Sequence, residues 1–181
     1  MNAARWQVLQ PARISEAEIG QLADVLIDCV AGGASVSFMS TLSHEQAASF
    51  WREVTSEAMA GRRALLLARD EHGICGTVQL NLDLPDNQPH RADVAKMLVH
   101  RRARRQGLGA ALMAAAEAAA RRMGRHLLVL DTVTGAEGAR LYERMGWVRV
   151  GDIPGYALWP QGGYCSTTYY YRDLSAAAPA S

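Results

Sequence analysis

The sequence is short of the features that mark secreted, membrane-spanning and metal-binding proteins. It has three cysteines, Cys29, Cys75 and Cys165, and none of them lies in a Cys-x-x-Cys pair. An odd number of well-separated cysteines argues against a disulfide framework or a zinc site and suits a reducing compartment. The first residues, MNAARWQVLQPAR, lack a signal-peptide pattern, and no later run reaches about 18 apolar residues. We therefore expect a cytoplasmic protein that does not span a membrane.

The sequence also lacks an excess of charge of one sign. Lys and Arg number 19 and Asp and Glu 18, so the formal net charge is +1. Such a chain has no overall field that attracts nucleic acid or an anionic membrane, and we expect neither as a partner. The arginines at 101, 102, 104 and 105 are a local feature. A nucleic-acid role for this run is the weakest alternative, because the run lacks interleaved aromatic residues.

Apolar residues, in contrast, are plentiful. They make up 49% of the residues, which is enough to bury a substantial core. A chain of 181 residues fits one domain and is too short for two of ordinary size. We expect a single domain over residues 1–181, with its core from about 5 to 174. The C-terminal segment 175–181 is small and contains proline, and we expect it to be disordered.

The order of apolar patterns predicts an α/β fold. The expected strands cover 5–10, 63–70, 74–82, 91–100, 126–131, 147–151 and 164–174, and the expected helices 15–31, 43–60, 108–123 and 134–145. Both of the first two helices open on a capping-box pattern. The segment IPGYALWPQGG, residues 153–163, is expected to be a loop. A strand–helix–strand unit after an antiparallel meander gives a mixed sheet with helices on its faces.

The loop before the helix 108–123 has the pattern of an anion site. Gly107 and Gly109 lack Cβ atoms, so their backbone can approach a ligand closely. The first amides of a helix have no intrahelical partner and lie at the positive end of the helix dipole, where a phosphate fits. Arg104 and Arg105 can add charge at the rim. We expect the arginines of this loop to serve an anionic ligand more than the fold.

Two other glycine motifs and a purely structural interpretation compete with this one. A Rossmann site would place Asp131 on a ribose, but Leu112 stands at the third glycine position and HRRARRQ separates the strand from the glycines. A Walker loop is excluded because no Gly-Lys-Ser/Thr follows. Glycine also begins many helices, and arginine occurs in many loops, without any ligand.

Tyr142 is the second candidate for a functional role. It lies in the helix that follows the strand 126–131, and strand ends and helix starts converge on one crevice of such a sheet. A phenol in that crevice can donate a proton. Packing of the helix is the alternative role, because Leu141 and Met145 share the segment.

These two segments resemble a known family. Residues 104–110, RRQGLGA, resemble the R/Q-x-x-G-x-G/A acetyl-CoA signature of the GNAT (Gcn5-related) N-acetyltransferases, and ARLYERMGWVRVG resembles the motif that follows it. The runs HRADVAKMLV, LLVLDT, GDIPGY and TTYYYRDL resemble the tabtoxin-resistance acetyltransferase group. The resemblance implies a GNAT fold: a mixed, mostly antiparallel sheet of about seven strands, a V-shaped splay between the fourth and fifth strands, and about four helices on both faces.

The resemblance also implies acetyl-CoA as the cosubstrate. Main-chain groups of residues 97–99 would hold the pantetheine, amides of residues 105–110 would hold the pyrophosphate, and Tyr142 would protonate the leaving thiolate. The cofactor-binding residues would thus be Met97, Leu98, Val99, Arg104, Arg105, Gln106, Gly107, Leu108, Gly109, Ala110 and Tyr142. No metal is implied.

The acceptor amine must lose a proton, and two aspartates are candidates for helping it. Asp93 is either a base or a charge at the sheet edge; Asp131 is a base, a group that orients a cationic substrate, or a helix cap. We expect the acceptor pocket to be built from the first helices, 15–60, and from the loop before the last strand.

The expected function is therefore acetyl-CoA-dependent N-acetylation of a primary amine of a small molecule. An antimetabolite or amino-acid-like toxin is the candidate acceptor, which would make the enzyme a source of antibiotic resistance. Two alternatives stay open, a protein or peptide N-acetyltransferase and a non-catalytic acyl-CoA-binding module. The chain is expected to act as a monomer or a homodimer.

Overall fold

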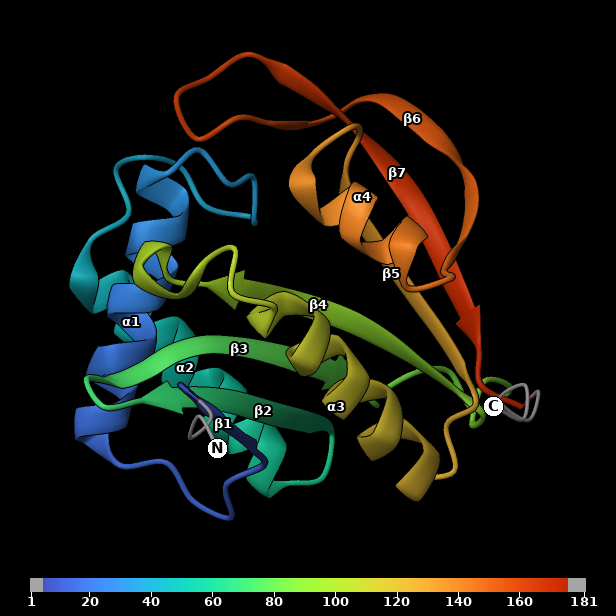
Figure 1. Ribbon diagram of the computed structural model, residues 1–181, viewed down its shortest axis with the longest axis horizontal. Helices are drawn as coiled ribbons and strands as arrows, with labels where there is room; N and C mark the ends of the chain where they lie inside the picture. Colours follow the sequence, from blue (N-terminus) through green and yellow to red (C-terminus); the bar gives the residue numbers. More distant parts are fainter. Residues whose placement is uncertain (1–4, 176–181) are drawn as a thin grey trace.

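The computed structural model describes residues 5–175, and its elements form one seven-stranded sheet with helices on both faces (Figure 1). The strands are β1 (Gln7–Leu9), β2 (Arg63–Asp70), β3 (Gly73–Asn81), β4 (Arg91–Val99), β5 (Leu127–Val133), β6 (Val148–Leu158) and β7 (Tyr164–Asp173). The helices are α1 (Glu16–Ala31), α2 (His44–Met59), α3 (Leu108–Arg122) and α4 (Glu137–Arg144), with a 3-10 turn at Arg101–Ala103. The strand order is β1-β2-β3-β4-β5-β7-β6, and only β4 and β5 are parallel. This is the fold that the sequence predicted.

Local sequence explains where the first two helices begin. Ser15 and Ser43 are the N-caps of α1 and α2, and each side chain accepts a hydrogen bond from the backbone three residues on. The side chains of Glu18 and Gln46 accept hydrogen bonds from the backbone amides of Ser15 and Ser43, so both predicted capping boxes are confirmed. Two of the amides that a helix start leaves without an intrahelical partner are thus satisfied in each of these helices.

The sheet divides the interior into two layers. Along β2, Leu65 and Leu67 pack with α1 and α2, whereas Leu66 and Ala68 pack with α3 on the other face. This follows from the alternation of side chains along a strand. Trp51 is fully buried in the α1–α2 layer, and Tyr142 of α4 belongs to the layer with α3.

The sheet opens between β4 and β5, as the family resemblance implied. The two strands pair only from Arg91–Asp93 to Leu127–Val129; beyond that point β4 stays with β3 and β5 stays with β7. A bulge at Lys96, whose φ of 48° is left-handed, shifts the register of β4 against β3. The bulge turns the end of β4 away from β5, and a gap is left between the two halves of the sheet.

One sequence prediction about the secondary structure is wrong. Residues 153–158, expected in a loop, continue β6 to Leu158, because Ile153, Ala157 and Leu158 pair with residues of β7. An irregular register between 153 and 157 accommodates Pro154 and Gly155, the residues on which the loop prediction depended. In addition, α4 begins at Glu137, three residues after the predicted start.

The extended β6–β7 hairpin reaches back to the segment between α1 and α2 (Figure 1). The amide of Ser40 donates to the carbonyl of Pro160 at 2.9 Å, and the hydroxyl of Ser35 donates to the carbonyl of Leu158 at 2.8 Å. The tip of the hairpin is thereby joined to the opposite half of the molecule across the gap in the sheet.

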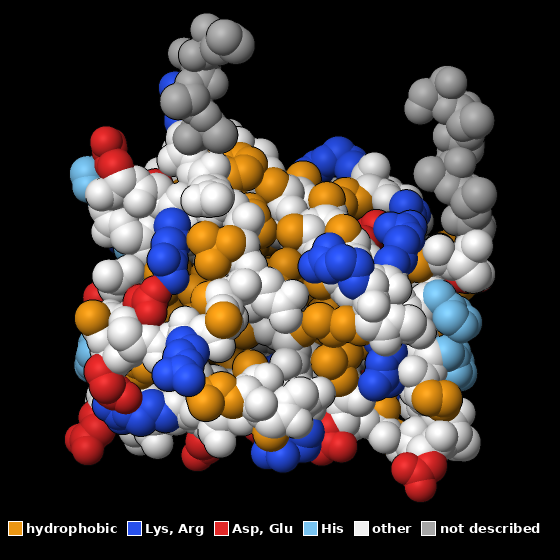
Figure 2. All heavy atoms as spheres, turned by 90° about the horizontal axis from the view of Figure 1, so that it is seen from below, with side chains coloured by type: hydrophobic (Ala, Val, Ile, Leu, Met, Phe, Trp, Pro, Cys, Tyr) orange, Lys and Arg blue, Asp and Glu red, His pale blue; other side chains and the backbone are white. Residues whose placement is uncertain are grey.

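The distribution of charge on the surface, the apolar length of the helices and the grouping of metal-ligating side chains can each be described for this structure. On the face shown in Figure 2, Lys and Arg side chains are separated by apolar and uncharged surface and form no continuous basic patch. Within residues 5–175, no helix is long and apolar enough to cross a bilayer, and no cluster of three metal-ligating side chains is found. Most of the segment predicted to be disordered, residues 176–181, lies outside the described residues.

Candidate active site

A cleft of about 1060 Å³ occupies the gap between the two halves of the sheet. Its walls come from the end of β4, the start of α3, α4 and the segment after α1. Of the eleven residues predicted to bind the cofactor, ten line it: Met97, Leu98, Val99, Arg104, Arg105, Gly107, Leu108, Gly109, Ala110 and Tyr142. The exception is Gln106, whose side chain is exposed and donates to the carbonyl of Arg102 at 2.9 Å.

The start of α3 presents free amides to this cleft. Gly107 is its N-cap with a left-handed φ of 83°, and no side chain caps the helix. The amide of Ala111 is the first to bond within the helix, to the carbonyl of Gly107 at 3.1 Å. A Cβ atom on Gly107 would meet no atom within 4 Å, so the backbone there borders open space. The amides of residues 108–110 are thus available to an anion at the positive end of the helix dipole.

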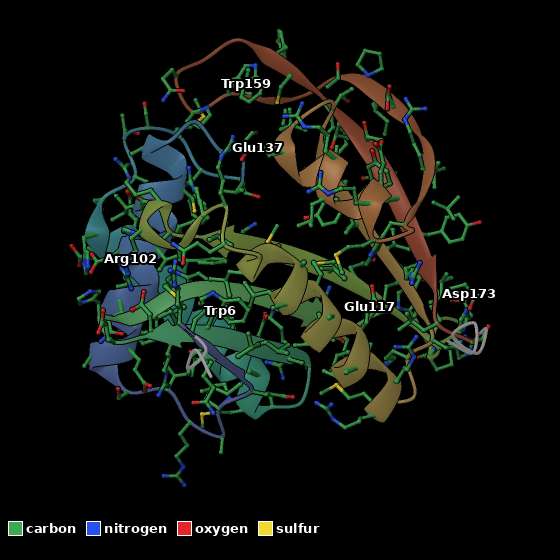
Figure 3. All side chains as sticks on the ribbon, viewed as in Figure 1. Trp6, Arg102, Glu117, Glu137, Trp159 and Asp173 are labelled. Atoms are coloured by element: carbon green, nitrogen blue, oxygen red, sulfur yellow. The ribbon has the colours of Figure 1, made fainter. Side chains whose placement is uncertain are left out.

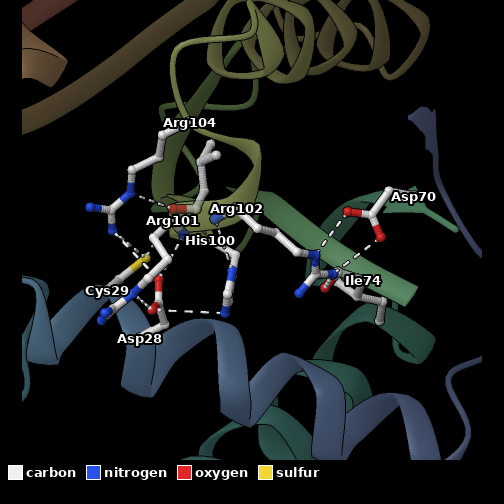
Figure 4. Close-up of polar contacts among 9 residues, drawn as sticks. Asp28, Cys29, Asp70, Ile74, His100, Arg101, Arg102 and Arg104 are labelled. Carbon is white, nitrogen blue, oxygen red and sulfur yellow. Dashed lines mark hydrogen bonds and ion pairs between the residues drawn. The ribbon is translucent and has the colours of Figure 1, made fainter. Parts of the chain in front are cut away.

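The arginines before these glycines have partners within the chain that hold the loop in place (Figure 4). That they also serve an anionic ligand stays a prediction. The guanidinium of Arg101 pairs with buried Asp28 of α1, which also accepts from the Arg101 amide at 2.9 Å. Arg102 donates to Asp70 at 2.9 Å. Arg104 donates to the carbonyl of Val99 at 3.0 Å, and its guanidinium lies 3.7 Å from Asp28.

Arg105 differs from the other three because its partner lies across the mouth of the cleft. Its guanidinium donates to Glu137, at the start of α4, at 2.6 Å. Both side chains are largely exposed, so the pair contributes little to stability. Glu137 and Trp159 both line the cleft, and in Figure 3 both lie in the upper half of the molecule, Trp159 on the β6–β7 hairpin and Glu137 at the start of α4. Arg105 is therefore the arginine that an anionic ligand can recruit at small cost.

Tyr142 lies in the wall of the cleft with its ring buried. The ring packs against Trp147 and Tyr170, with centroid distances of 5.9 and 6.1 Å. Burial, and to a lesser degree the charge of Asp131, raises the pKa of Tyr142 well above its usual value of about 10. The phenol therefore stays protonated at neutral and mildly alkaline pH, which is the state that a proton donor needs.

Asp93 and Asp131 face the side of the sheet opposite to Tyr142. Their neighbours along the strands, such as Val94 and Leu130, pack in the layer with α3, so the aspartates point the other way. Asp93 is ion-paired with Arg91. Asp131 is exposed, and the hydroxyl of Thr167 lies 2.9 Å from its Oδ2. Neither aspartate lines the cleft itself.

A pair of tyrosines lies on the same side as the aspartates. The hydroxyls of Tyr156 and Tyr169 are 2.9 Å apart. This hydrogen bond, burial and the charges of Asp131 and Asp93 raise the pKa of Tyr169 to about 12. This side of the sheet therefore carries the two aspartates and two phenol groups, none of which is Tyr142.

Sequence reasoning missed several residues that shape the site. Asp28 supports the glycine loop, and Glu137 holds Arg105. Gly138 lets α4 lie close to β5, because a Cβ there would be 3.1 Å from Thr132 Oγ1. Their signals are weak, since each depends on a contact with a residue that is distant in sequence or on packing within a helix. Gly138 alone carries a hint, as a glycine at the second position of a short helix.

Comparisons with known proteins agree with this geometry. Residues 61–149 match the model of the acetyltransferase (GNAT) domain. The structure is similar to YncA from Salmonella typhimurium, solved with its cofactor acetyl-CoA, at 16% identity and a TM-score of 0.76 over 98% of this chain and 99% of that one. A GCN5-related N-acetyltransferase from Kribbella flavida shares 24% identity, with a TM-score of 0.76 over 94% and 98% of the two chains. 

A third similar structure is the ribosomal-protein-alanine N-acetyltransferase of Brucella melitensis, at 19% identity and a TM-score of 0.77 over 93% of this chain and 99% of that one. At these identities the structural likeness shows a shared fold. The sequence match covers β2 to the start of β6, including the splayed strands, the glycine loop and Tyr142. Residues 61–149 thus match the GNAT acetyltransferase domain, and the chain as a whole has the GNAT fold.

Proposed function

We propose that the protein transfers the acetyl group of acetyl-CoA to a primary amine of a small molecule. The observation that carries the proposal is the position of Tyr142, a buried proton donor in a cleft whose far wall offers the free amides of α3. Acetyl-CoA supplies an activated acyl thioester and a diphosphate. The amides of residues 108–110 would hold the diphosphate, and Arg105 would leave Glu137 to join them.

The residues divide the proton transfers between the two sides of the sheet. Tyr142 donates its phenolic proton to the sulfur that leaves when the acceptor nitrogen bonds to the acetyl carbon. The acceptor approaches from the side of Asp131 and must arrive as a neutral amine. An alkyl ammonium has a pKa of about 10.4, so roughly one molecule in a thousand is neutral at pH 7.4.

Of the two aspartates, Asp131 is better suited to receive the acceptor. Asp93 is already paired with Arg91, whereas Asp131 has a hydroxyl partner and is exposed. We propose that Asp131 orients the ammonium and accepts its proton, directly or through water, and that Asp93 adds negative charge to the region.

The tip of the β6–β7 hairpin, which covers the acceptor side, favours a small molecule as the acceptor. The hairpin tip bonds to the segment after α1 through Ser40 and Ser35, which closes the side along which a long peptide would lie. An antimetabolite or amino-acid-like toxin, as for the tabtoxin-resistance group, is the acceptor type that we propose for the first screen. A panel of small amines, amino acids, aminated antibiotics and peptides, assayed by acetyl-CoA consumption, tests this choice.

The role of Tyr142 is tested by Tyr142→Phe. We expect unchanged affinity for acetyl-CoA and a fall in kcat of about 100-fold or more, in the range of lost general acid catalysis. Since the pKa of Tyr142 is raised, wild-type kcat should not decline between pH 7 and 9.5, where an acid of lower pKa would already be titrated. Equal kcat in the variant, or a wild-type decline centred near pH 8, would remove Tyr142 from the acid role.

A further inference from the structure

Lys96 is the only lysine in the sequence, against 18 arginines. It stands at the bulge of β4, with a left-handed φ of 48°, immediately before the cleft residue Met97. Val94 and Met97 both pack in the layer with α3, so the bulge inserts Ala95 and Lys96 between two residues of the same face. The side chain of Lys96 is thereby directed to the other face, where Asp131 and the acceptor side lie.

The ammonium of Lys96 is held by neutral groups. Its Nζ donates to the hydroxyl of Ser37 at 3.1 Å and lies 5.9 and 5.8 Å from the ring centroids of Phe38 and Phe50. Aromatic faces at this distance attract a cation and at the same time limit its access to water. Within the described part of the chain, no carboxylate oxygen lies within 4.0 Å of this nitrogen, whereas Arg63, Arg91, Arg101, Arg102 and Arg105 each have one.

The environment makes this charge costly to keep without a partner. Burial and the neighbouring charge of Arg63 lower the pKa of Lys96, and the charge of Asp131 opposes that shift. A partly buried ammonium gains most from an anion that arrives in the same space. Lys96 on β4 and Asp131 on β5 face the same side of the sheet, because their neighbours Met97 and Leu130 pack in the layer with α3.

We propose that Lys96 binds an anionic group of the acceptor, so that the acceptor is an amine that also carries a carboxylate or a similar acidic group. The inference rests on the proposed function and narrows its substrate class. Asp131 would take the ammonium end and Lys96 the acidic end, with Ser37 as a second donor to the anion. An amine without a negative charge would leave Lys96 unpaired.

Steady-state kinetics with matched acceptors test the proposal. Each α-amino acid is compared with the amine that remains when its carboxylate is removed. We expect wild type to prefer the amino acid, and Lys96→Met to raise KM for it by about 10- to 100-fold, the range of a charge-assisted hydrogen bond, with little change in kcat or in KM for the amine. Lys96→Arg should restore part of the preference, because it restores the charge. Arg122→Met, at the exposed end of α3, is the control for loss of a cation.

The single lysine permits a direct measurement as well. Protein labelled with [ε-15N]lysine has one lysine side-chain resonance, and it reports on Lys96 alone. With CoA bound, the amino acids of the panel should shift this resonance, and the matched amines should leave it in place. Equal acceptor preference in wild type and Lys96→Met, or a resonance that moves with neither ligand, would overturn the proposal.

The two arms also separate this inference from the proposed function. If no member of the panel is acetylated, the proposed function fails, and the resonance still decides whether Lys96 binds a carboxylate. If amines without an acidic group are acetylated as well as the amino acids, acetyl transfer stands and the role of Lys96 is refuted. Acetylation of Lys96 itself, seen as a mass increase of that one residue, would mean that its amine is an acceptor and not a binding group.

Discussion

At the scale of single residues, the catalytic proposal depends on space left for Tyr142. A Cβ on Gly138 would lie 3.1 Å from Thr132 Oγ1 and 3.5 Å from the Tyr142 ring. The first distance is tighter than most Cβ contacts, and the second is an ordinary van der Waals contact with the ring. Gly138 therefore permits the close approach of α4 to β5 that sets the position of the phenol in the cleft.

Gly138→Ala should consequently lower activity without harming the fold. Alanine favours a helix over glycine by about 1 kcal/mol, which offsets the crowding. We expect Tm within a few degrees of wild type, unchanged acetyl-CoA affinity and a kcat reduced by about tenfold through displacement of Tyr142. Gly20→Ala in α1, where a Cβ meets nothing within 4 Å, is the matched control and should leave kcat unchanged. Equal kcat for both variants would contradict the positioning role.

At the scale of elements, α1 supports the glycine loop from behind. Asp28 is buried and receives the amide and the guanidinium of Arg101, with His100 and Arg104 nearby (Figure 4). One carboxylate thus ties the helix to the turn that leads into α3. Since the amides of residues 108–110 form the proposed diphosphate site, the position of that site depends on a helix some 70 residues earlier in the chain.

Asp28→Asn should weaken both the fold and the cofactor site. The amide keeps one acceptor but removes the charge from a buried site that faces the guanidinium groups of Arg101 and Arg104, and we expect a loss of about 1–3 kcal/mol in the free energy of unfolding. Acetyl-CoA affinity should fall by a few-fold to tenfold, measured by calorimetry. Arg105→Ala, which removes an exposed pair with Glu137, should change stability by less than about 0.5 kcal/mol and is the comparison. Wild-type stability of Asp28→Asn would show that the network is dispensable.

Local patterns predicted those parts of the molecule that local interactions determine. Neighbouring residues determine the capping boxes of Ser15 and Ser43 and the alternation of side chains along the strands. They also determine that the start of α3 has no side-chain cap. Residues 153–158 did not, because their pairing with β7 outweighs the signals of Pro154 and Gly155. The partners of the loop arginines, Asp28, Asp70 and Glu137, were not predicted either, since they lie far away in sequence. No local pattern around Lys96 predicted the bulge, which is defined by the pairing of β4 with β3.

At the scale of the whole molecule, the cleft joins two halves of a sheet that share only a short parallel pairing. Three pairs of residues connect β4 with β5, and the hairpin contacts at Ser35 and Ser40 form a second connection. A ligand held by the start of α3 and by the wall that contains Tyr142 would form a third. Acetyl-CoA should therefore stabilise the native protein as well as serve the reaction.

The stabilisation by acetyl-CoA gives a test that needs no acceptor. At 100 times its Kd, a ligand adds about 2.7 kcal/mol, and for a chain of this length we expect Tm to rise by about 5–10 °C. Gly107→Val should fold with a lower Tm, because a left-handed φ costs a branched residue about 1–2 kcal/mol, and should lose the rise with acetyl-CoA. Gly61→Val, at a φ of 73° outside the cleft, carries the same backbone strain and should keep the rise. If Gly107→Val still gains stability from acetyl-CoA, the start of α3 is not the diphosphate site, and the cofactor must be held elsewhere in the cleft.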